Sequence, residues 1–244
     1  HGYLTLPPGS DGKNLPTIVH PHGGPWARDG WGYNPAIQFL ASRGYAVLQV
    51  NFRGSTGFGM EHYLASRQQW GQSMQNDIGD ALQWAIDNGY SDADRVCIYG
   101  GSYGGYAVMA GLTYTPDLYK CGINYVGVTD LPLLFKTAPD SWASGLGQMK
   151  EMVGDPKKNK EFLQEWSPSN HADKIKAPVF MAYGRQDPRV NIKHATIMEK
   201  AMKKNNVEYE LMIKNDEGHG YRKQENQYDF YGRMETFLAE NLNP

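Results

Sequence analysis

The segment at residues 100–105, which reads GGSYGG, constrains the fold of this chain more than any other feature of its sequence. It follows a run of strand-forming residues at 95–99 and precedes small residues that are able to open a helix. A Gly-x-Ser-x-Gly pattern places a serine on a tight strand-to-helix turn, where the doubled-back chain leaves room only for glycine on either side. The pattern predicts Ser102 as an exposed nucleophile, although glycine-rich turns also occur in purely structural roles.

A serine hydroxyl becomes a nucleophile when a general base lies within hydrogen-bond reach and a third group fixes the tautomer of that base. In the α/β-hydrolase arrangement these groups follow in the order serine, acid, histidine, each on a loop after a strand. Residues 177–184 predict a short buried strand, and Asp187 follows its end. Residues 209–213 predict a further strand, and His219 follows between two glycines. We therefore predict Asp187 as the acid and His219 as the base.

Two other aspartates compete for the role of the acid. Asp130 follows residues 125–129, which also predict a strand, and Asp216 lies three positions before His219. Asp216 is too close in sequence to the histidine to occupy a separate loop. A loop aspartate is often only a helix cap, and a lone loop histidine often lies at the surface. The order of nucleophile, acid and base along the chain favours Asp187 over both alternatives.

Backbone amides that can stabilise an oxyanion are predicted at two places. One is the N–H of Tyr103, because it directly follows the nucleophile. The other lies in the loop that follows a β-branched strand at 17–19, where Gly23 and Gly24 let the backbone approach a substrate closely. Alternating strand and helix signals along the rest of the chain predict an α/β fold with a mostly parallel central sheet and helices on both faces.

Four motifs in a fixed order give this chain a resemblance to the catalytic domain of the prolyl oligopeptidase family of serine peptidases. The motifs are HGGP at 22–25, NFRGSTGFG at 51–59, GSYGGY at 101–106 and EGHG at 217–220. The resemblance covers nearly the whole chain and is closest to the acylaminoacyl-peptidase and dipeptidyl-peptidase-like branches. It implies an α/β-hydrolase fold in which Ser102, Asp187 and His219 match the catalytic triad.

The resemblance also suggests Gly24 as the second amide donor, by its place in the HGGP motif. Some branches of the family carry a tyrosine where this chain has His22, and use its hydroxyl group on the oxyanion. The resemblance therefore leaves the contribution of His22 open.

Peptidases of this family usually carry a β-propeller domain ahead of the hydrolase domain. The 244 residues of this chain have room for one α/β-hydrolase domain, spanning 1–244, and for no propeller. We expect either a catalytic domain whose propeller lies outside this sequence or a compact relative that works without one. Association into a homo-oligomer is left open.

Triad chemistry is shared by peptidases and esterases, so the substrate remains to be decided between them. The resemblance favours a peptidase that cleaves amide bonds of short or N-acylated peptides through an acyl-enzyme. A chain without a propeller favours a carboxylesterase acting on small acyl esters, because activated esters need less accurate positioning of the leaving group. A non-catalytic binding protein would be expected to have a broken triad, which this sequence does not have.

Substrate-binding candidates come from the segments beside these motifs. The excursion at 139–168 lacks strand character and carries tryptophan and methionine residues that are able to wall a pocket. Arg53 lies in a glycine-rich loop, where an internal tie is favoured over a contact with substrate. The predicted substrate-binding residues are Tyr106, Val128, Trp142, Arg189 and Val190.

Composition narrows the function classes further. The net charge of −2 gives no basis for binding nucleic acid or a membrane surface, and no apolar run approaches the roughly 18 residues that span a bilayer. His20 and His22 resemble a metal-binding pair, but no cysteine or acidic cluster completes the site, so we expect no metal and no cofactor. Cys97 and Cys121 are predicted as free thiols in interior strands, which fits the cytoplasm; pairing in an oxidising compartment is the alternative.

Overall fold

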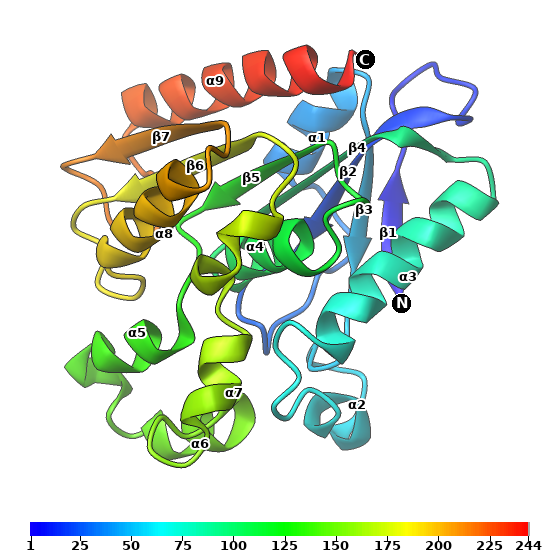
Figure 1. Cartoon of the computed structure of the whole chain (residues 1–244). Coiled ribbons are helices and arrows are strands. Elements are labelled where there is room, and N and C mark those ends of the chain that lie inside the picture. The colour runs from blue at the N-terminus through cyan, green and yellow to red at the C-terminus, as the bar shows by residue number, and fades with distance from the viewer. Residues whose placement is uncertain (244) are drawn as a thin grey trace.

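The structure is a computed structural model that describes residues 1–243. Its centre is a seven-stranded sheet in the order β1-β3-β2-β4-β5-β6-β7 (Figure 1). Neighbouring strands run parallel except for the edge strand β1, which is antiparallel to β3. The strands are β1 (Gly2–Thr5), β2 (Leu15–Pro21), β3 (Ala46–Val50), β4 (Ser91–Gly101), β5 (Cys121–Tyr125), β6 (Val179–Gly184) and β7 (Tyr209–Lys214).

Helices cover both faces of the sheet, as parallel strands require. Met74 of α3 and Met198 of α8 belong to one apolar core, whereas Leu40 of α1 and Phe230 of α9 belong to the core on the opposite face. Helices α2, α5, α6 and α7 gather at the lower end in the view of Figure 1. The α-helices are α1 (Pro35–Ser42), α2 (Met60–Leu64), α3 (Ser73–Asp87), α4 (Tyr103–Tyr114), α5 (Leu131–Lys136), α6 (Leu146–Val153), α7 (Lys160–Glu165), α8 (Lys193–Lys204) and α9 (Gln224–Leu242), with short 3₁₀ turns at Asp140–Trp142, Pro168–Asn170 and Ala172–Lys174.

The predicted fold class is confirmed, since this arrangement is the α/β-hydrolase fold. The predicted strand at 125–129 is wrong, because β5 ends at Tyr125. At Val126 the backbone φ angle is +47°, a left-handed conformation that ends the extended run. Residues 126–130 therefore form a loop at the end of the sheet, although Val126 and Val128 read as strand formers in the sequence.

The two cysteines differ from the expectation of free thiols. Cys97 in β4 and Cys121 in β5 lie opposite each other in the parallel register, with their Cα atoms 4.7 Å apart, and they form a disulfide. Both side chains point to the face of the sheet that α1 and α9 cover. The register of β4 against β5 brings the two sulfur atoms together, and sequence spacing alone does not predict it.

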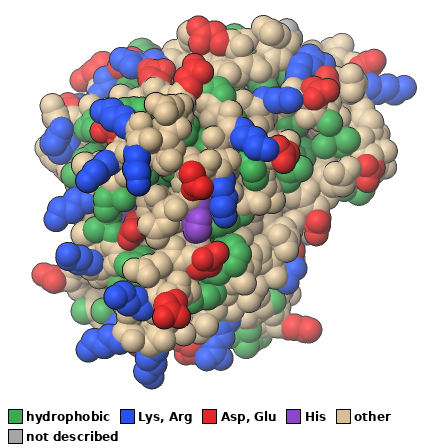
Figure 2. All heavy atoms as spheres, in the orientation of Figure 1, with side chains coloured by type: hydrophobic (Ala, Val, Ile, Leu, Met, Phe, Trp, Pro, Cys, Tyr) green, Lys and Arg blue, Asp and Glu red, His purple; other side chains and the backbone are tan. Residues whose placement is uncertain are grey.

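Charged side chains are dispersed over the surface. Figure 2 shows Lys and Arg interspersed with Asp and Glu over the face in view. Among residues 1–243, no helix is both long and apolar enough to cross a membrane. The cytoplasmic location stays a prediction from the sequence.

Candidate active site

Ser102 lies at the turn between β4 and α4. Its backbone angles are φ 58° and ψ −117°, a conformation that is strained for a residue other than glycine. Its N–H donates a hydrogen bond to the carbonyl oxygen of Tyr125, at the end of the neighbouring strand (2.9 Å). The strained turn holds the serine at the end of β4, and Ser102 lines a cavity of about 610 Å³.

The glycines around the serine are required by close backbone contacts. A Cβ atom at Gly104 would lie 2.3 Å from the carbonyl oxygen of Pro21, and one at Gly100 would lie 2.6 Å from the backbone of Gly104. A Cβ atom at Gly105 would lie 2.6 Å from Gly127. Because these neighbours are main-chain atoms, they cannot move aside as a flexible side chain can. The segment predicted from its glycines as a nucleophile elbow is therefore packed against the backbone of Pro21 and of Gly127 and folded closely on itself.

We expect Gly104→Ala to lower the free energy of unfolding by about 2–3 kcal/mol or more, because the added methyl group overlaps a main-chain oxygen. The matched control is Gly79→Ala in the middle of α3, where the added Cβ would meet only Leu118 at 3.5 Å. That change is expected to be neutral or to stabilise the protein by about 0.5–1 kcal/mol through higher helix propensity. Urea denaturation of both variants measures the difference, and equal effects would contradict the packing argument.

Asp187 and His219 form the hydrogen-bonded pair that the sequence predicts. The Nδ1–H of His219 donates to Oδ2 of Asp187 (2.7 Å), and Asp187 is 6% exposed. The other carboxylate oxygen, Oδ1, accepts the backbone N–H groups of Arg189 (2.8 Å) and Val190 (2.9 Å). The carboxylate is therefore fixed by its own loop. This pairing leaves Nε2 of His219 free, and His219 lines the same cavity as Ser102.

Glu217 anchors the loop that carries His219. Its carboxylate is 3% exposed and accepts the backbone N–H groups of Arg222 (3.0 Å) and Lys223 (2.8 Å) and the side-chain amide of Asn226 (2.9 Å). Its carbonyl oxygen accepts the N–H of Gln186, beside the acid (2.9 Å). One residue thus holds both loops of the acid–base pair.

The two competing aspartates have other partners. Asp130 caps α5, since its Oδ1 accepts the N–H of Leu133 (2.7 Å) and its Oδ2 accepts the hydroxyl of Ser169 (3.3 Å). Asp216 pairs with the ammonium group of Lys223 (2.6 Å). Among the residues that the structure describes, neither is hydrogen-bonded to His219, so Asp187 is the aspartate that the fold pairs with the histidine.

In the described part of the chain, two residues that line the same cavity have backbone amides without an acceptor. Gly24 and Tyr103 both line the cavity beside Ser102. Within residues 1–243, neither the N–H of Gly24 nor that of Tyr103 donates a hydrogen bond to the protein. Unpaired amides at the start of a helix and in a glycine loop are suited to hold a developing negative charge.

The cavity receives most of the predicted substrate-binding residues. Val128, Trp142, Arg189 and Val190 line it, and they come from the loop after β5, the excursion and the loop after β6. The prediction of Tyr106 as a substrate-binding residue is wrong, because its side chain is fully buried and its hydroxyl donates to the carbonyl oxygen of Trp166 (2.9 Å). Lining residues that the sequence did not single out are Trp26, Tyr63, Trp70, Leu134, Ser141, Ser144, Gly145 and Gln148.

Most of these additional residues carry little signal in the sequence. Trp26 directly follows the HGGP motif and was within reach of sequence reasoning. Trp70 precedes α3, far from any motif, and reaches the cavity because it packs edge-on against the ring of Tyr103 at 4.6 Å between centroids. Tyr63 and Gln148 meet across the cavity through a hydrogen bond of 3.1 Å.

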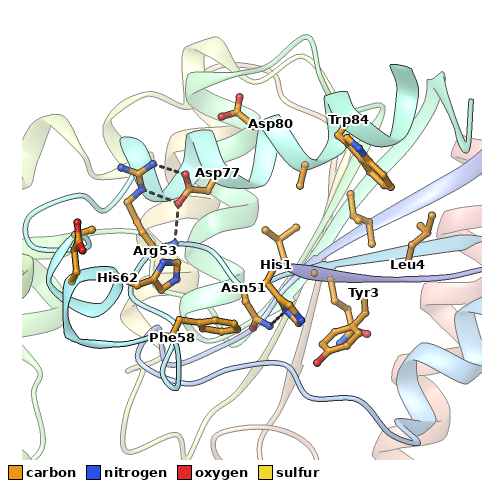
Figure 3. Close-up of a pocket in the computed structure, with 17 residues that line it drawn as sticks. His1, Tyr3, Leu4, Asn51, Arg53, Phe58, His62, Asp77, Asp80 and Trp84 are labelled. Atoms are coloured by element: carbon orange, nitrogen blue, oxygen red, sulfur yellow. Dashed lines mark hydrogen bonds and ion pairs between the residues drawn. The ribbon is translucent and has the colours of Figure 1, made fainter. Parts of the chain in front are cut away.

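Arg53 and His20 are hydrogen-bonded to other residues of the protein, and neither lines the cavity of Ser102. A larger cavity of about 790 Å³ lies between β1 and α3 and contains neither Ser102 nor His219 (Figure 3). There the guanidinium of Arg53 donates to both carboxylate oxygens of Asp77 (2.5 and 2.8 Å), an internal tie for its loop. His20 bonds through Nδ1–H to the carbonyl oxygen of Tyr99 (2.8 Å).

His194, at the start of α8, ties this helix to the loop that carries Val128. Its Nδ1 accepts the N–H of Thr129 (3.2 Å), and its carbonyl oxygen accepts the hydroxyl of Thr129 (2.8 Å). The imidazole is fully buried, and its Nε2 has no partner among the described residues. Burial lowers the pKa of His194 to about 4, against a smaller opposing effect of Asp187.

This depressed pKa predicts a loss of stability in mild acid. In the unfolded chain this imidazole protonates below about pH 6.5, whereas in the folded protein it stays neutral down to about pH 4. Its contribution to the free energy of unfolding is therefore fully present above about pH 6.5 and is lost as the pH falls toward 4. The contribution of His194 to that loss is on the order of 2–3 kcal/mol. His194→Asn removes the titrating group but keeps an acceptor near Thr129. Urea unfolding at pH 7 and pH 4.5 is expected to show a smaller loss for this variant, and equal losses would refute the assignment.

The fold and this site together define an α/β hydrolase with a nucleophile elbow, an Asp–His pair and two unpaired amides around one cavity. Comparison with known proteins adds the family. The sequence profile of the prolyl oligopeptidase family matches residues 31–244, and this chain belongs to that family of serine peptidases.

Individual relatives support the same assignment. The chain is 45% identical to dipeptidyl aminopeptidase BIII of Pseudoxanthomonas mexicana over 98% of its own length and 36% of that protein. A puromycin-hydrolysing peptidase of Mycobacterium tuberculosis has a similar structure, with a TM-score of 0.93 and 30% identity over 99% of this chain and 37% of that one. An acylaminoacyl peptidase of Pyrococcus horikoshii gives a TM-score of 0.90 and 28% identity over 99% and 39% of the two chains. The chain thus spans little more than a third of the length of these relatives.

Proposed function

We propose that this chain is the catalytic part of a serine peptidase that cleaves amide bonds of short or N-acylated peptides through an acyl-enzyme on Ser102. The observation that carries the proposal is the hydrogen bond between His219 and the buried Asp187, on the cavity that Ser102 also lines. The peptidase names of the relatives support an amide substrate.

The proposed reaction uses each of these groups in a stated step. Nε2 of His219 takes the proton of Ser102 while Oγ attacks the scissile carbonyl carbon, and Asp187 stabilises the imidazolium that forms. The N–H groups of Gly24 and Tyr103 donate to the oxygen that becomes negative. His219 then gives its proton to the leaving amine, and water releases the acyl group by the same steps in reverse order.

The wall of the cavity supports an apolar group on the acyl side of the cleaved bond. Val128, Leu134 and Trp142 contribute apolar surface to the cavity that Ser102 lines, and Trp26 and Trp70 add aromatic surface. Arg189 is the cationic side chain on this wall, so we assign it a contact with a carbonyl oxygen or carboxylate of the substrate.

The test compares the purified chain on acyl-aminoacyl and dipeptidyl p-nitroanilides and on a short-chain p-nitrophenyl ester. A fluorophosphonate probe counts the reactive serines in the same samples. Turnover of an amide that disappears with Ser102→Ala supports the peptidase proposal. Turnover of the ester alone would favour the alternative, a carboxylesterase with the same triad, and a chain that the probe does not label would overturn both.

A further inference from the structure

His22 connects the loop of Gly23 and Gly24 with the segment 51–59, two motifs that lie far apart in the sequence. The hydroxyl of Ser55 donates to Nε2 of His22 (2.8 Å), and the Nδ1–H of His22 donates to the carbonyl oxygen of Gly23 (2.8 Å). His22 is 7% exposed and Ser55 is fully buried. Because both ring nitrogens have partners, the imidazole has no further N–H to offer a substrate.

The carbonyl group that His22 holds belongs to the peptide unit of a candidate oxyanion donor. The oxygen of Gly23 and the N–H of Gly24 share one planar peptide, which is trans. In a trans peptide the C=O and N–H bonds point in opposite directions, so a fixed carbonyl fixes the direction of the N–H. With glycine on both sides, no side chain restricts the rotation of this peptide. The hydrogen bond from His22 supplies that restriction.

The ring of His22 is itself held in place by an aromatic contact. It stacks on the ring of Phe52, with centroids 4.4 Å apart and planes 16° apart. Phe52 also contacts the ring of Tyr103, at 5.3 Å between centroids. One packed group of rings therefore connects His22, which holds the Gly23 carbonyl, with Tyr103, which carries the other candidate amide. Burial also lowers the pKa of His22, which keeps the ring in the neutral form that both hydrogen bonds require.

We propose that Ser55 and His22 aim the Gly24 N–H at the oxygen of the tetrahedral intermediate, which makes His22 a positioning residue of the reaction. The inference rests on the proposed hydrolysis at Ser102. Ser55 sets the tautomer of the imidazole, the imidazole holds the Gly23 carbonyl, and the shared peptide transmits this orientation to the amide of Gly24. No covalent bond to His22 forms or breaks.

The test measures kcat and KM for His22→Ala, His22→Asn and Ser55→Ala, on whichever ester or amide the unaltered chain turns over fastest. Fluorophosphonate titration converts each kcat to a rate per reactive serine. We expect His22→Ala to lower kcat roughly 10²-fold with KM within about threefold, since one oxyanion donor contributes about this much to the transition state. The side-chain amide of His22→Asn is able to reach the Gly23 carbonyl, so the kcat of this variant is expected to be roughly tenfold higher than that of His22→Ala. The kcat of Ser55→Ala is expected to be roughly tenfold lower than that of the unaltered chain.

A peptidyl trifluoromethyl ketone gives a second readout, because its adduct with Ser102 carries an oxyanion. Its inhibition constant is expected to rise in parallel with the loss in kcat. The control is His171→Ala: the imidazole of His171 also donates to a backbone carbonyl, that of Glu165 (2.7 Å), but it lies beside Tyr114 and does not line the cavity of Ser102. Its kcat is expected to stay within twofold.

Three outcomes decide the inference. A rate per reactive serine within threefold of the unaltered chain in His22→Ala would overturn it. If that variant has no titratable serine because it does not fold, an unchanged rate per serine in Ser55→Ala would overturn it instead. If the unaltered chain is neither labelled by the fluorophosphonate nor inhibited by the trifluoromethyl ketone, the proposed hydrolysis fails and this inference fails with it.

Discussion

Ser102→Ala is expected to lower turnover of every ester and amide substrate by roughly four to six orders of magnitude, because the change removes the oxygen that attacks the substrate. The change removes one oxygen atom and keeps the Cβ atom, which the turn already accommodates at the strained backbone angles of Ser102. The fold is therefore expected to persist. The measurement is kcat on p-nitroanilides and p-nitrophenyl esters, with fluorophosphonate labelling of the same preparation.

One result would contradict the assignment of Ser102 as the nucleophile. If Ser102→Ala keeps more than about a hundredth of the activity while labelling is lost, a different group performs the reaction and the triad assignment is wrong. Circular dichroism and urea denaturation of the variant serve as controls, and both are expected to match the unaltered chain closely.

Asp187→Asn is expected to lower kcat roughly 10⁴-fold with little change in KM, the second largest effect. The asparagine side chain is able to keep one acceptor for the N–H groups of Arg189 and Val190, but its amide group turned toward His219 disfavours the required tautomer. The pair then no longer leaves Nε2 of His219 free to accept the proton of the serine. Kinetics per reactive serine measure the effect.

Asp130→Asn is the matched control for this change. Asp130 caps α5 and was the alternative acid in the sequence, yet it bonds to Leu133 and Ser169. We expect a cost of about 1 kcal/mol or less in stability and a kcat per reactive serine within threefold, because asparagine is also a good helix cap. A larger loss of kcat for Asp130→Asn than for Asp187→Asn would reverse the assignment of the acid.

The proposed triad was predictable because each member lies in a short pattern at the end of a strand. Ser102 is surrounded by glycines that its turn requires, and His219 follows the last strand with a glycine on each side. Parallel strands bring such loops to one edge of the sheet, so chain order carries spatial information. Gly24 was suggested as the second amide donor by its place in the HGGP motif; it lines the same cavity as Ser102, and its role as a donor stays a prediction.

Tyr106 and the cysteines show where sequence reasoning ended. All of residues 103–113 in α4 are buried, so no polar face indicates which side of this helix meets the cavity. Tyr106 consequently points toward Trp166 instead. Cys97 and Cys121 meet through the register of two strands, which depends on how α4 packs as a crossover. Both errors concern three-dimensional placement that periodicity does not encode.

The division of the active groups among the strands has a consequence for folding. The acid and the base come from β6 and β7, which are neighbours, and lie 32 residues apart in the chain. The nucleophile comes from β4, and β5 separates it from β6 in the sheet. The acid–base pair is thus complete within the C-terminal part of the chain, whereas its meeting with the serine requires β5 to be docked on both sides. During refolding, reactivity toward a fluorophosphonate would report closure of the whole sheet, and not the formation of any single element.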